Sequence, residues 1–93
     1  MILVTTKHYD KKSKKFFKSH PQLKQKYKSV VLHLVEDINH PSLKLHKLKG
    51  DLDGLWAASL DYQFRIILIV EFIQDRIVLV DIGSHDDVYG HYR

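Results

Sequence analysis

The clearest pattern in this sequence is a set of apolar residues that recur every three or four positions in its second quarter. They are Leu23, Tyr27, Val30, Val31, Leu34, Val35 and Ile38. This spacing predicts a helix with a single apolar stripe, and the lysines between these residues point away from the stripe. Pro21 suits the first turn of such a helix, and the segment Asn-His-Pro-Ser at residues 39–42 ends it.

A first helix is expected over residues 7–19, following a short strand at residues 2–5. Thr6 is a suitable N-cap, because its hydroxyl can accept a hydrogen bond from a backbone N–H of the first turn. The apolar side of this helix consists of Tyr9, Phe16 and Phe17. Lysines surround that side, so the first third of the chain is predicted to contain amphipathic helices.

From Leu43 onward the apolar period changes to two, which predicts strands. In the first of these strands Leu43, Leu45 and Lys47 share one face, and Lys44, His46 and Leu48 share the other. Further strands are expected over residues 55–60, 63–73 and 76–82, with turns at residues 50–54, 61–62 and 74–75. The strand at 63–73 is apolar on both faces in its middle, so we expect it to be central.

This order of elements, β-α-α-β-β-β-β, predicts an α+β fold. Two N-terminal helices would pack on one face of an antiparallel sheet of four to five strands. Ninety-three residues are expected to form a single domain, residues 1–93, because so short a chain cannot bury a second core.

The composition excludes several classes of function. There is no cysteine, which removes disulfides, thiolate catalysis and sulfur-containing zinc sites. The first apolar run, residues 1–4, is too short for a signal peptide, and the longest one, residues 66–70, is too short to span a bilayer. A cytoplasmic location is therefore expected.

The positive charge is concentrated in the first third of the chain. Residues 1–28 contain nine lysines and one acidic residue, a net charge of +8, whereas residues 29–93 carry a net charge of −4. A lysine-dense segment favours a polyanionic partner such as RNA, or an acidic protein. The alternative is that these lysines form a solvated helix face without a partner.

His85 is a candidate for acid–base chemistry, because it follows Gly83 and Ser84 at the exit of a predicted strand. RNA can be cleaved through its own 2′-hydroxyl, which requires a proton acceptor, a proton donor and a cation for the developing charge. A histidine exchanges protons near neutral pH, so His85 could be the donor. A lone histidine more often has a structural role, but Tyr89 and a second histidine in a strand favour chemistry.

Arg65 and His46 are the other candidates. Arg65 lies in an apolar strand, where its guanidinium must bind either a phosphate or a carboxylate, with Asp61, Asp81 and Glu71 as possible partners. His46 has lysines at positions 44, 47 and 49, which disfavour protonation, so a neutral His46 could act as general base. The alternative is a surface histidine on an edge strand.

Two further roles stay open. Tyr89 could stack on a base or cap the core. The acids Asp86 and Asp87 beside His85 could hold a magnesium ion, although adjacent acids in a loop are commonly solvated. We expect no metal and no other cofactor. Trp56 is expected to pack in the core or between a helix and the sheet.

The stretch from Leu45 to Tyr89 resembles the RelE/ParE superfamily of toxins, most closely its YafQ-type branch. The matching segments are Leu-His-Lys-Leu-Lys-Gly at 45–50, Gly-Leu-Trp at 54–56, Phe-Arg-Ile-Ile at 64–67 and Gly-Ser-His-Asp-Asp-Val-Tyr at 83–89. The preceding helices also fit in length and lysine content. The resemblance implies a bacterial toxin of a type II toxin–antitoxin system that cleaves mRNA, typically in the ribosomal A site.

The resemblance also implies roles for single residues. His85 matches the C-terminal catalytic histidine, Arg65 the arginine that contacts the scissile phosphate, and His46 a histidine of the YafQ branch. The RNA-binding residues would be Lys47, Lys49, Tyr89 and Asp61. Ser59, Gln63 and Asp81 stand where some members carry histidine, aspartate and arginine, so His46 is the first choice for the general base and Asp61 the second.

The expected partners are mRNA, the 30S ribosomal A site with its rRNA, and a cognate antitoxin protein that alone would bind operator DNA. No membrane partner is expected. The alternative function is a non-enzymatic ParE-like toxin that binds a protein such as a topoisomerase. ParE-like members lack this set of histidines, which favours the nuclease.

Overall fold

The computed structural model describes residues 1–48 and 54–91, the last two of them, Gly90 and His91, by their backbone alone. The strands are β1 (Ile2–Thr5), β2 (His46–Lys47), β3 (Trp56–Ser59), β4 (Phe64–Glu71) and β5 (Arg76–Ser84). The helices are α1 (Lys7–Ser19), α2 (Lys24–Glu36) and α3 (His85–His91), with 3₁₀ turns at Pro21–Leu23 and Pro41–Leu43. The fold class predicted from the sequence, α+β, is confirmed.

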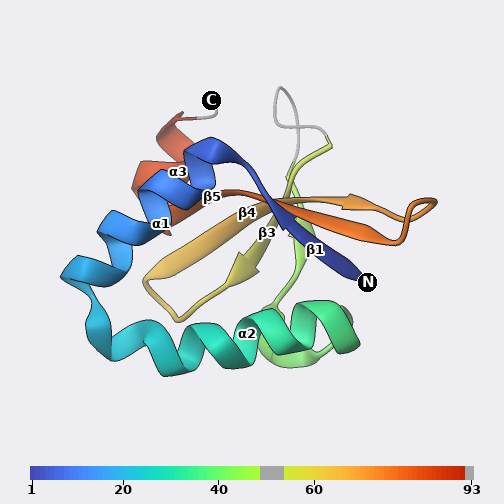
Figure 1. Ribbon diagram of the computed structural model, residues 1–93, viewed down its shortest axis with the longest axis horizontal. Helices are drawn as coiled ribbons and strands as arrows, with labels where there is room; N and C mark the ends of the chain where they lie inside the picture. The colour runs from blue at the N-terminus through green and yellow to red at the C-terminus, as the bar shows by residue number, and fades with distance from the viewer. Residues whose placement is uncertain (49–53, 92–93) are drawn as a thin grey trace.

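The strands form one sheet in the order β1-β5-β4-β3-β2 (Figure 1). β4 lies at its centre, as its apolar sequence predicts. Neighbouring strands are antiparallel from β2 to β5, but β1 pairs with β5 in parallel. The prediction of a purely antiparallel sheet was therefore wrong at this edge. The first and last strands run the same way, and a four-residue strand carries no pattern that reveals its neighbour.

One face of the sheet packs against α1 and α2 (Figure 1). The buried residues on the helical side are Tyr9, Phe16, Val30 and Leu34, and those of β3 to β5 are Ala58, Phe64, Ile66, Leu68, Ile77, Leu79 and Ile82. The predicted N-cap of α1 is present, because the Thr6 hydroxyl accepts a hydrogen bond from the backbone N–H of Tyr9 at 3.0 Å. The helix bounds 7–19 match the prediction.

The opposite face is covered in part by α3, a helix that was not expected from the sequence. Its fully buried Val88 packs with Leu48, Ala57 and Ile67. The Ser84 hydroxyl accepts a hydrogen bond from the backbone N–H of Asp87 at 3.2 Å and caps the helix. A serine three residues before an acidic residue is a sequence signal for the N-terminus of a helix. A seven-residue helix is nevertheless too short to show the periodic spacing of apolar residues that predicts helices.

The bounds of the middle elements differ from those predicted. β2 is only His46–Lys47, because Leu43 ends a 3₁₀ turn and Lys44 adopts a left-handed conformation with φ of 47°. The second helix begins as a 3₁₀ turn and becomes α-helical at Lys24. β5 extends to Ser84. The predicted turn at 50–54 lies outside the described residues except for Gly54, whose φ of 91° suits glycine.

None of the helices within residues 1–48 and 54–91 is long and apolar enough to cross a membrane.

Candidate functional site

The candidate residues His46, Arg65 and Tyr89 lie on the α3 side of the sheet. His46 is paired with Ala57, which is paired with Ile67, so the three side chains share one face. Arg65 is two residues from Ile67 and therefore lies on the same face. Because α3 packs on this face through Val88, its neighbour Tyr89 and the histidine at its start are brought to the same side.

Tyr89 links the two candidate histidines. Its hydroxyl lies 3.3 Å from Nε2 of His46, and its ring meets that of His85 edge-on, with centroids 4.2 Å apart and an interplanar angle of 90°. His85 and Tyr89 are four residues apart on one helix, which places them on the same face. The structure thus brings together three residues that come from two distant segments of the chain.

The hydrogen bonds of His46 define which ring nitrogen faces the site. Its Nδ1 lies 2.9 Å from the carbonyl oxygen of Lys44, and a carbonyl can only accept, so Nδ1 carries the hydrogen. In the neutral ring Nε2 then has a free lone pair, toward which the Tyr89 hydroxyl points. A base with its lone pair fixed toward the site is the arrangement that proton abstraction requires.

Burial raises the pKa of Tyr89, and the positive charge of Arg65 opposes this effect. The hydroxyl therefore stays protonated at neutral pH. It can donate a hydrogen bond to Nε2 of His46. Arg65 lies on the same face of the sheet as His46, and no hydrogen bond joins it to Tyr89 within the described part of the chain.

Arg65 is held by carbonyl groups and not by a carboxylate. Its Nη1 donates to the carbonyl oxygens of Asp61 at 2.6 Å and Phe64 at 3.0 Å. The three carboxylates considered as partners have other roles: Glu71 binds Arg76, Asp81 binds Lys12, and the side chain of Asp61 accepts from backbone N–H groups. Among the described residues, no carboxylate forms an ion pair with Arg65, so its charge is available to an anionic ligand.

His85 is the first residue of α3 and is exposed, with 55% of its side chain accessible. Its backbone N–H donates to the carbonyl oxygen of Gln63 at 3.3 Å, which fixes the start of the helix to the turn between β3 and β4. Nδ1 lies 3.5 Å from the Asp86 carboxylate. The ring is therefore anchored at its backbone but accessible to a substrate.

Two of the predicted RNA-binding residues do not direct their side chains toward this cluster, although the backbone carbonyl of Asp61 binds Arg65. Lys47 points to the other side of β2, where its ammonium lies 5.4 Å from the ring centre of Trp56. Asp61 uses its carboxylate to bind the backbone N–H groups of Gln63 and Phe64, at 2.9 and 2.8 Å, and so holds the β3–β4 turn. Lys49 lies outside the described residues.

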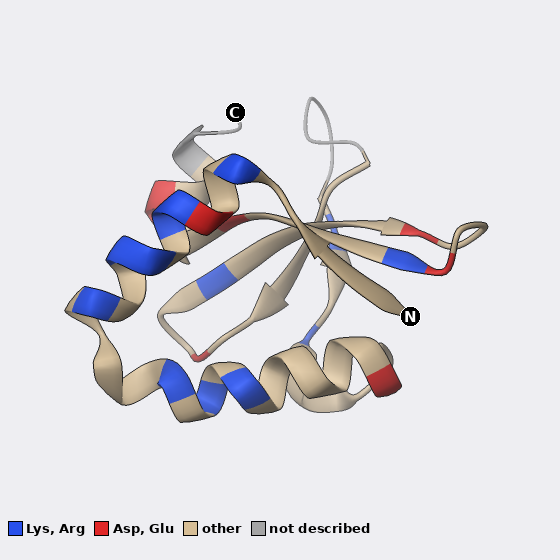
Figure 2. Ribbon diagram, viewed as in Figure 1, with Lys and Arg blue, Asp and Glu red and all other residues tan. Residues whose placement is uncertain are grey.

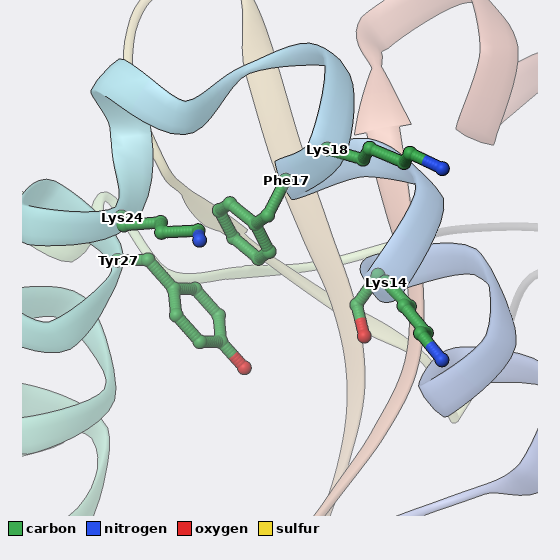
Figure 3. A pocket seen from close by; sticks show the side chains of 6 residues that line it. Lys14, Phe17, Lys18, Lys24 and Tyr27 are labelled. Atoms are coloured by element: carbon green, nitrogen blue, oxygen red, sulfur yellow. The ribbon is translucent and has the colours of Figure 1, made fainter.

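A second candidate surface is an open pocket of ≈ 520 Å³ between α1 and α2 (Figure 3). The pocket is lined by three lysines, Lys14, Lys18 and Lys24, and by the rings of Phe17 and Tyr27, whose centroids are 4.6 Å apart. The Lys24 amine lies beside the rings, whereas those of Lys14 and Lys18 point away from them (Figure 3). Lysines lie along α1 and in the first part of α2 (Figure 2). Both aromatic rings are only partly exposed. Positive charge beside accessible aromatic rings is the combination that binds single-stranded nucleic acid.

Across residues 1–48 and 54–91, no three histidine, cysteine, aspartate or glutamate side chains come together as metal ligands. The acids beside His85 differ in their surroundings. Asp87 binds Lys12, and the side chain of Asp86 is fully exposed.

The fold, with two helices on one face of this five-stranded sheet and a short C-terminal helix on the other, is that of the RelE/ParE toxins of toxin–antitoxin systems. Among solved structures, the chain is similar to YafQ from Escherichia coli BL21(DE3), with a TM-score of 0.80 and 17% identity over 95% of this chain and 97% of that one. The likeness expected from the sequence is thus confirmed.

Two further structures extend this likeness. A metal-bound toxin from Helicobacter pylori matches with a TM-score of 0.79 and 27% identity over 95% of this chain and 98% of that one. A chain of the Escherichia coli DinJ–YafQ complex matches with a TM-score of 0.78 and 18% identity over 95% of this chain and 97% of that one. No protein-family model and no curated protein matches the sequence.

Proposed function

We propose that this chain is the toxin of a type II toxin–antitoxin system and an endoribonuclease that cleaves mRNA and thereby inhibits translation. The observation that carries the proposal is the contact of Tyr89 with both His46 and His85 on the face of the sheet that also presents Arg65. Cleavage through the 2′-hydroxyl needs a base, an acid and a cation, and this cluster contains one group suited to each role.

In the proposed reaction Nε2 of His46 takes the proton of the 2′-hydroxyl, and the 2′-oxygen attacks the adjacent phosphorus. The bond from phosphorus to the 5′-oxygen breaks, and His85 donates a proton to that oxygen. The products are a 2′,3′-cyclic phosphate and a free 5′-hydroxyl. Arg65 binds the phosphate oxygens, on which negative charge accumulates in the transition state.

The Tyr89 hydroxyl occupies the position at His46 that the substrate hydroxyl takes in this reaction. Tyr89 therefore holds the imidazole in its productive orientation before RNA binds. Asp61, the second candidate for the base, is the weaker choice because its carboxylate already binds two backbone N–H groups. The non-enzymatic, ParE-like alternative gives no role to the paired histidines and is not favoured.

The proposal is tested by induced expression in bacteria with primer extension on a reporter mRNA, comparing the wild type with His85→Ala and Arg65→Ala. Discrete cuts that vanish in both variants support a ribonuclease with these residues at its centre. Cuts in frame with the codons further support cleavage on the ribosome. Growth arrest with intact mRNA would instead favour a binding toxin.

We also propose that a cognate antitoxin neutralises the toxin, as the complex of DinJ with YafQ suggests. An acidic or amphipathic segment would be attracted by the lysines of α1 and α2 and by Arg65. Operator DNA would be bound only through this partner. Purification from the native operon should yield a complex, and recovery of the free toxin alone would argue against the partner.

The pocket between α1 and α2 is expected to bind the RNA backbone away from the cleaved bond. Replacing both Lys14 and Lys24 with alanine should weaken RNA binding. The slope of log affinity against log salt should fall by about 0.7 for each phosphate that is no longer neutralised. The control is Lys7→Ala with Lys28→Ala, which removes the same charge outside this pocket. An equal weakening in both pairs would show that only net charge matters.

The Tyr89→Phe variant should cleave RNA more slowly, by up to about tenfold, because it lacks the hydrogen bond to His46 while the ring still meets that of His85. Stopped-time cleavage assays with saturating RNA would measure the change. Tyr62→Phe is the matched control, since Tyr62 is 88% exposed in the β3–β4 turn. An unchanged rate in Tyr89→Phe would remove Tyr89 from the mechanism.

A further inference from the structure

Lys12 of α1 lies between two carboxylates, one of the sheet and one of α3. Its Nζ is 2.6 Å from Oδ1 of Asp81 and 2.9 Å from Oδ2 of Asp87. Asp81 is completely buried, and the side chain of Lys12 is 29% exposed. Burial lowers the pKa of Lys12, but hydrogen bonds to the two carboxylates outweigh burial and raise it, so the ammonium stays charged.

The fold explains how a residue of α1 reaches the α3 side of the sheet. β1 ends at Thr5, opposite Leu79, and leaves the rest of the β5 edge without a partner strand. α1 begins beside this edge, where the backbone N–H of Thr6 donates to the carbonyl of Leu79 at 3.2 Å. α1 and α3 consequently lie side by side at the end of β5 (Figure 1).

The carboxylate of Asp87 lies directly over Gly83. A Cβ at Gly83 would overlap Oδ2 of Asp87 and lie 3.3 Å from its Cγ, so only glycine leaves room for this side chain. Gly83 is the cross-strand partner of Arg65. Side chains at such paired positions start only about 4.5–5.5 Å apart. Asp87 therefore stands in the position that the cross-strand neighbour of Arg65 would occupy.

The position of the Asp87 carboxylate matters for Arg65 if this arginine binds phosphate. A carboxylate over the strand partner of an arginine is within reach of forming an ion pair with its guanidinium, and such a pair would exclude the phosphate. Here Asp87 binds Lys12 instead, and no ion pair with Arg65 forms among the described residues. The ammonium of Lys12 is therefore the positive charge with which the Asp87 carboxylate pairs.

We propose that Lys12 is a positioning residue for RNA cleavage: by binding Asp87 and Asp81 together, it keeps the Asp87 carboxylate away from Arg65 and leaves that guanidinium free for the phosphate. This inference rests on the proposed function, because it assigns phosphate binding to Arg65. It extends the site to α1, which contributes no other residue to the reacting cluster within the described chain.

A direct substitution of Lys12 is not a sufficient test, because it would leave the buried Asp81 carboxylate with only His8, whose Nε2 lies 3.5 Å away, as an ion-pair partner and would destabilise the protein. The pair Lys12→Met with Asp81→Asn removes the Lys12 ammonium together with the buried carboxylate and leaves Asp87 without its partner. The triple variant adds Asp87→Asn and removes the competing carboxylate. Comparison of these two proteins isolates Asp87, since both share the same change in the core. Lys11→Met serves as the control for removal of a lysine from α1.

The first readout is binding of an RNA whose 2′-hydroxyl at the cleavage position is replaced by hydrogen, so that it binds but is not cleaved. The double variant should bind it about tenfold more weakly or worse, as expected when a charge-assisted hydrogen bond to phosphate is removed. The triple variant should recover binding close to that of Lys11→Met. If the triple variant binds no better than the double variant, the proposal is wrong.

The second readout does not depend on RNA. The NMR signal of the Arg65 Nε–H should shift toward that of an ion-paired arginine in the double variant and return in the triple variant. If the wild type binds no RNA but this shift is seen, the proposed function fails while the control of Asp87 by Lys12 stands. An Arg65 signal that is the same in both variants would overturn the role of Lys12 whatever the RNA result.

Discussion

His85→Ala is expected to lower the rate of RNA cleavage by roughly 10²–10⁴-fold, the usual contribution of a positioned general acid. The reason is that the 5′-oxygen leaves as a poor, strongly basic group unless it receives a proton in the transition state. The side chain of His85 is 55% exposed, and its anchoring hydrogen bond to Gln63 is made by its backbone N–H. The substitution should therefore leave the fold intact.

The assignment of His85 as the acid, and not the base, can be measured with a modified RNA. A sulfur atom in place of the 5′-oxygen leaves as a thiolate, which needs no proton because thiols have a pKa of about 8.5. His85→Ala should cleave this RNA almost as fast as the wild type, whereas His46→Ala should remain slow. Thermal unfolding of each variant would verify that it is folded.

The matched control is His33→Ala, which removes a histidine from α2, on the other side of the sheet. It should cleave both RNAs at the wild-type rate. If the sulfur substitution restores His46→Ala and not His85→Ala, the two roles are reversed. If it restores neither variant, both histidines act before the leaving group departs, and the proposed division of roles is incorrect.

Elements with a local signal were predictable from the sequence. α1 was predicted with its observed bounds because Thr6 caps it and its apolar residues are set among lysines. The central place of β4 followed from apolar residues on both of its faces. α3 was missed because seven residues hold too few apolar positions to show a period, although Ser84 and Asp87 marked its start.

The candidate site could be predicted in its residue types but not in its geometry. The alternation in the segment around β2 put His46 and Lys47 on opposite faces, so the sequence already implied that both could not face one site. The ion pair of Lys12 with Asp87 joins residues from the two ends of the chain, and no local pattern records such a pair. The parallel pairing of β1 with β5 also joins the two ends of the chain, so it too leaves no local pattern in the sequence.

Arg65→Ala is expected to reduce cleavage by roughly 10²–10³-fold, the usual cost of removing a group that stabilises the transition-state charge. Arg65→Lys should be nearly as impaired. Nη1 of the arginine is bound by the carbonyls of Asp61 and Phe64, which leaves Nη2 and Nε for two parallel bonds to a phosphate. A single ammonium cannot occupy the carbonyl anchor and also bind the phosphate at two points.

The measurement is kcat/KM on the same RNA for both substitutions, beside Arg76→Lys as the control. Arg76 has an equivalent guanidinium, but it binds Glu71 through Nε and Nη2, both at 2.9 Å, where β4 and β5 approach their connecting hairpin. Its replacement should leave cleavage unchanged. If Arg65→Lys were as active as the wild type, a simple positive charge would be sufficient and the bidentate interaction would be excluded. An equal reduction in Arg76→Lys and Arg65→Lys would argue against a specific role for Arg65, because Arg76 lies at the hairpin end of β4 and β5, away from Arg65 and Gly83.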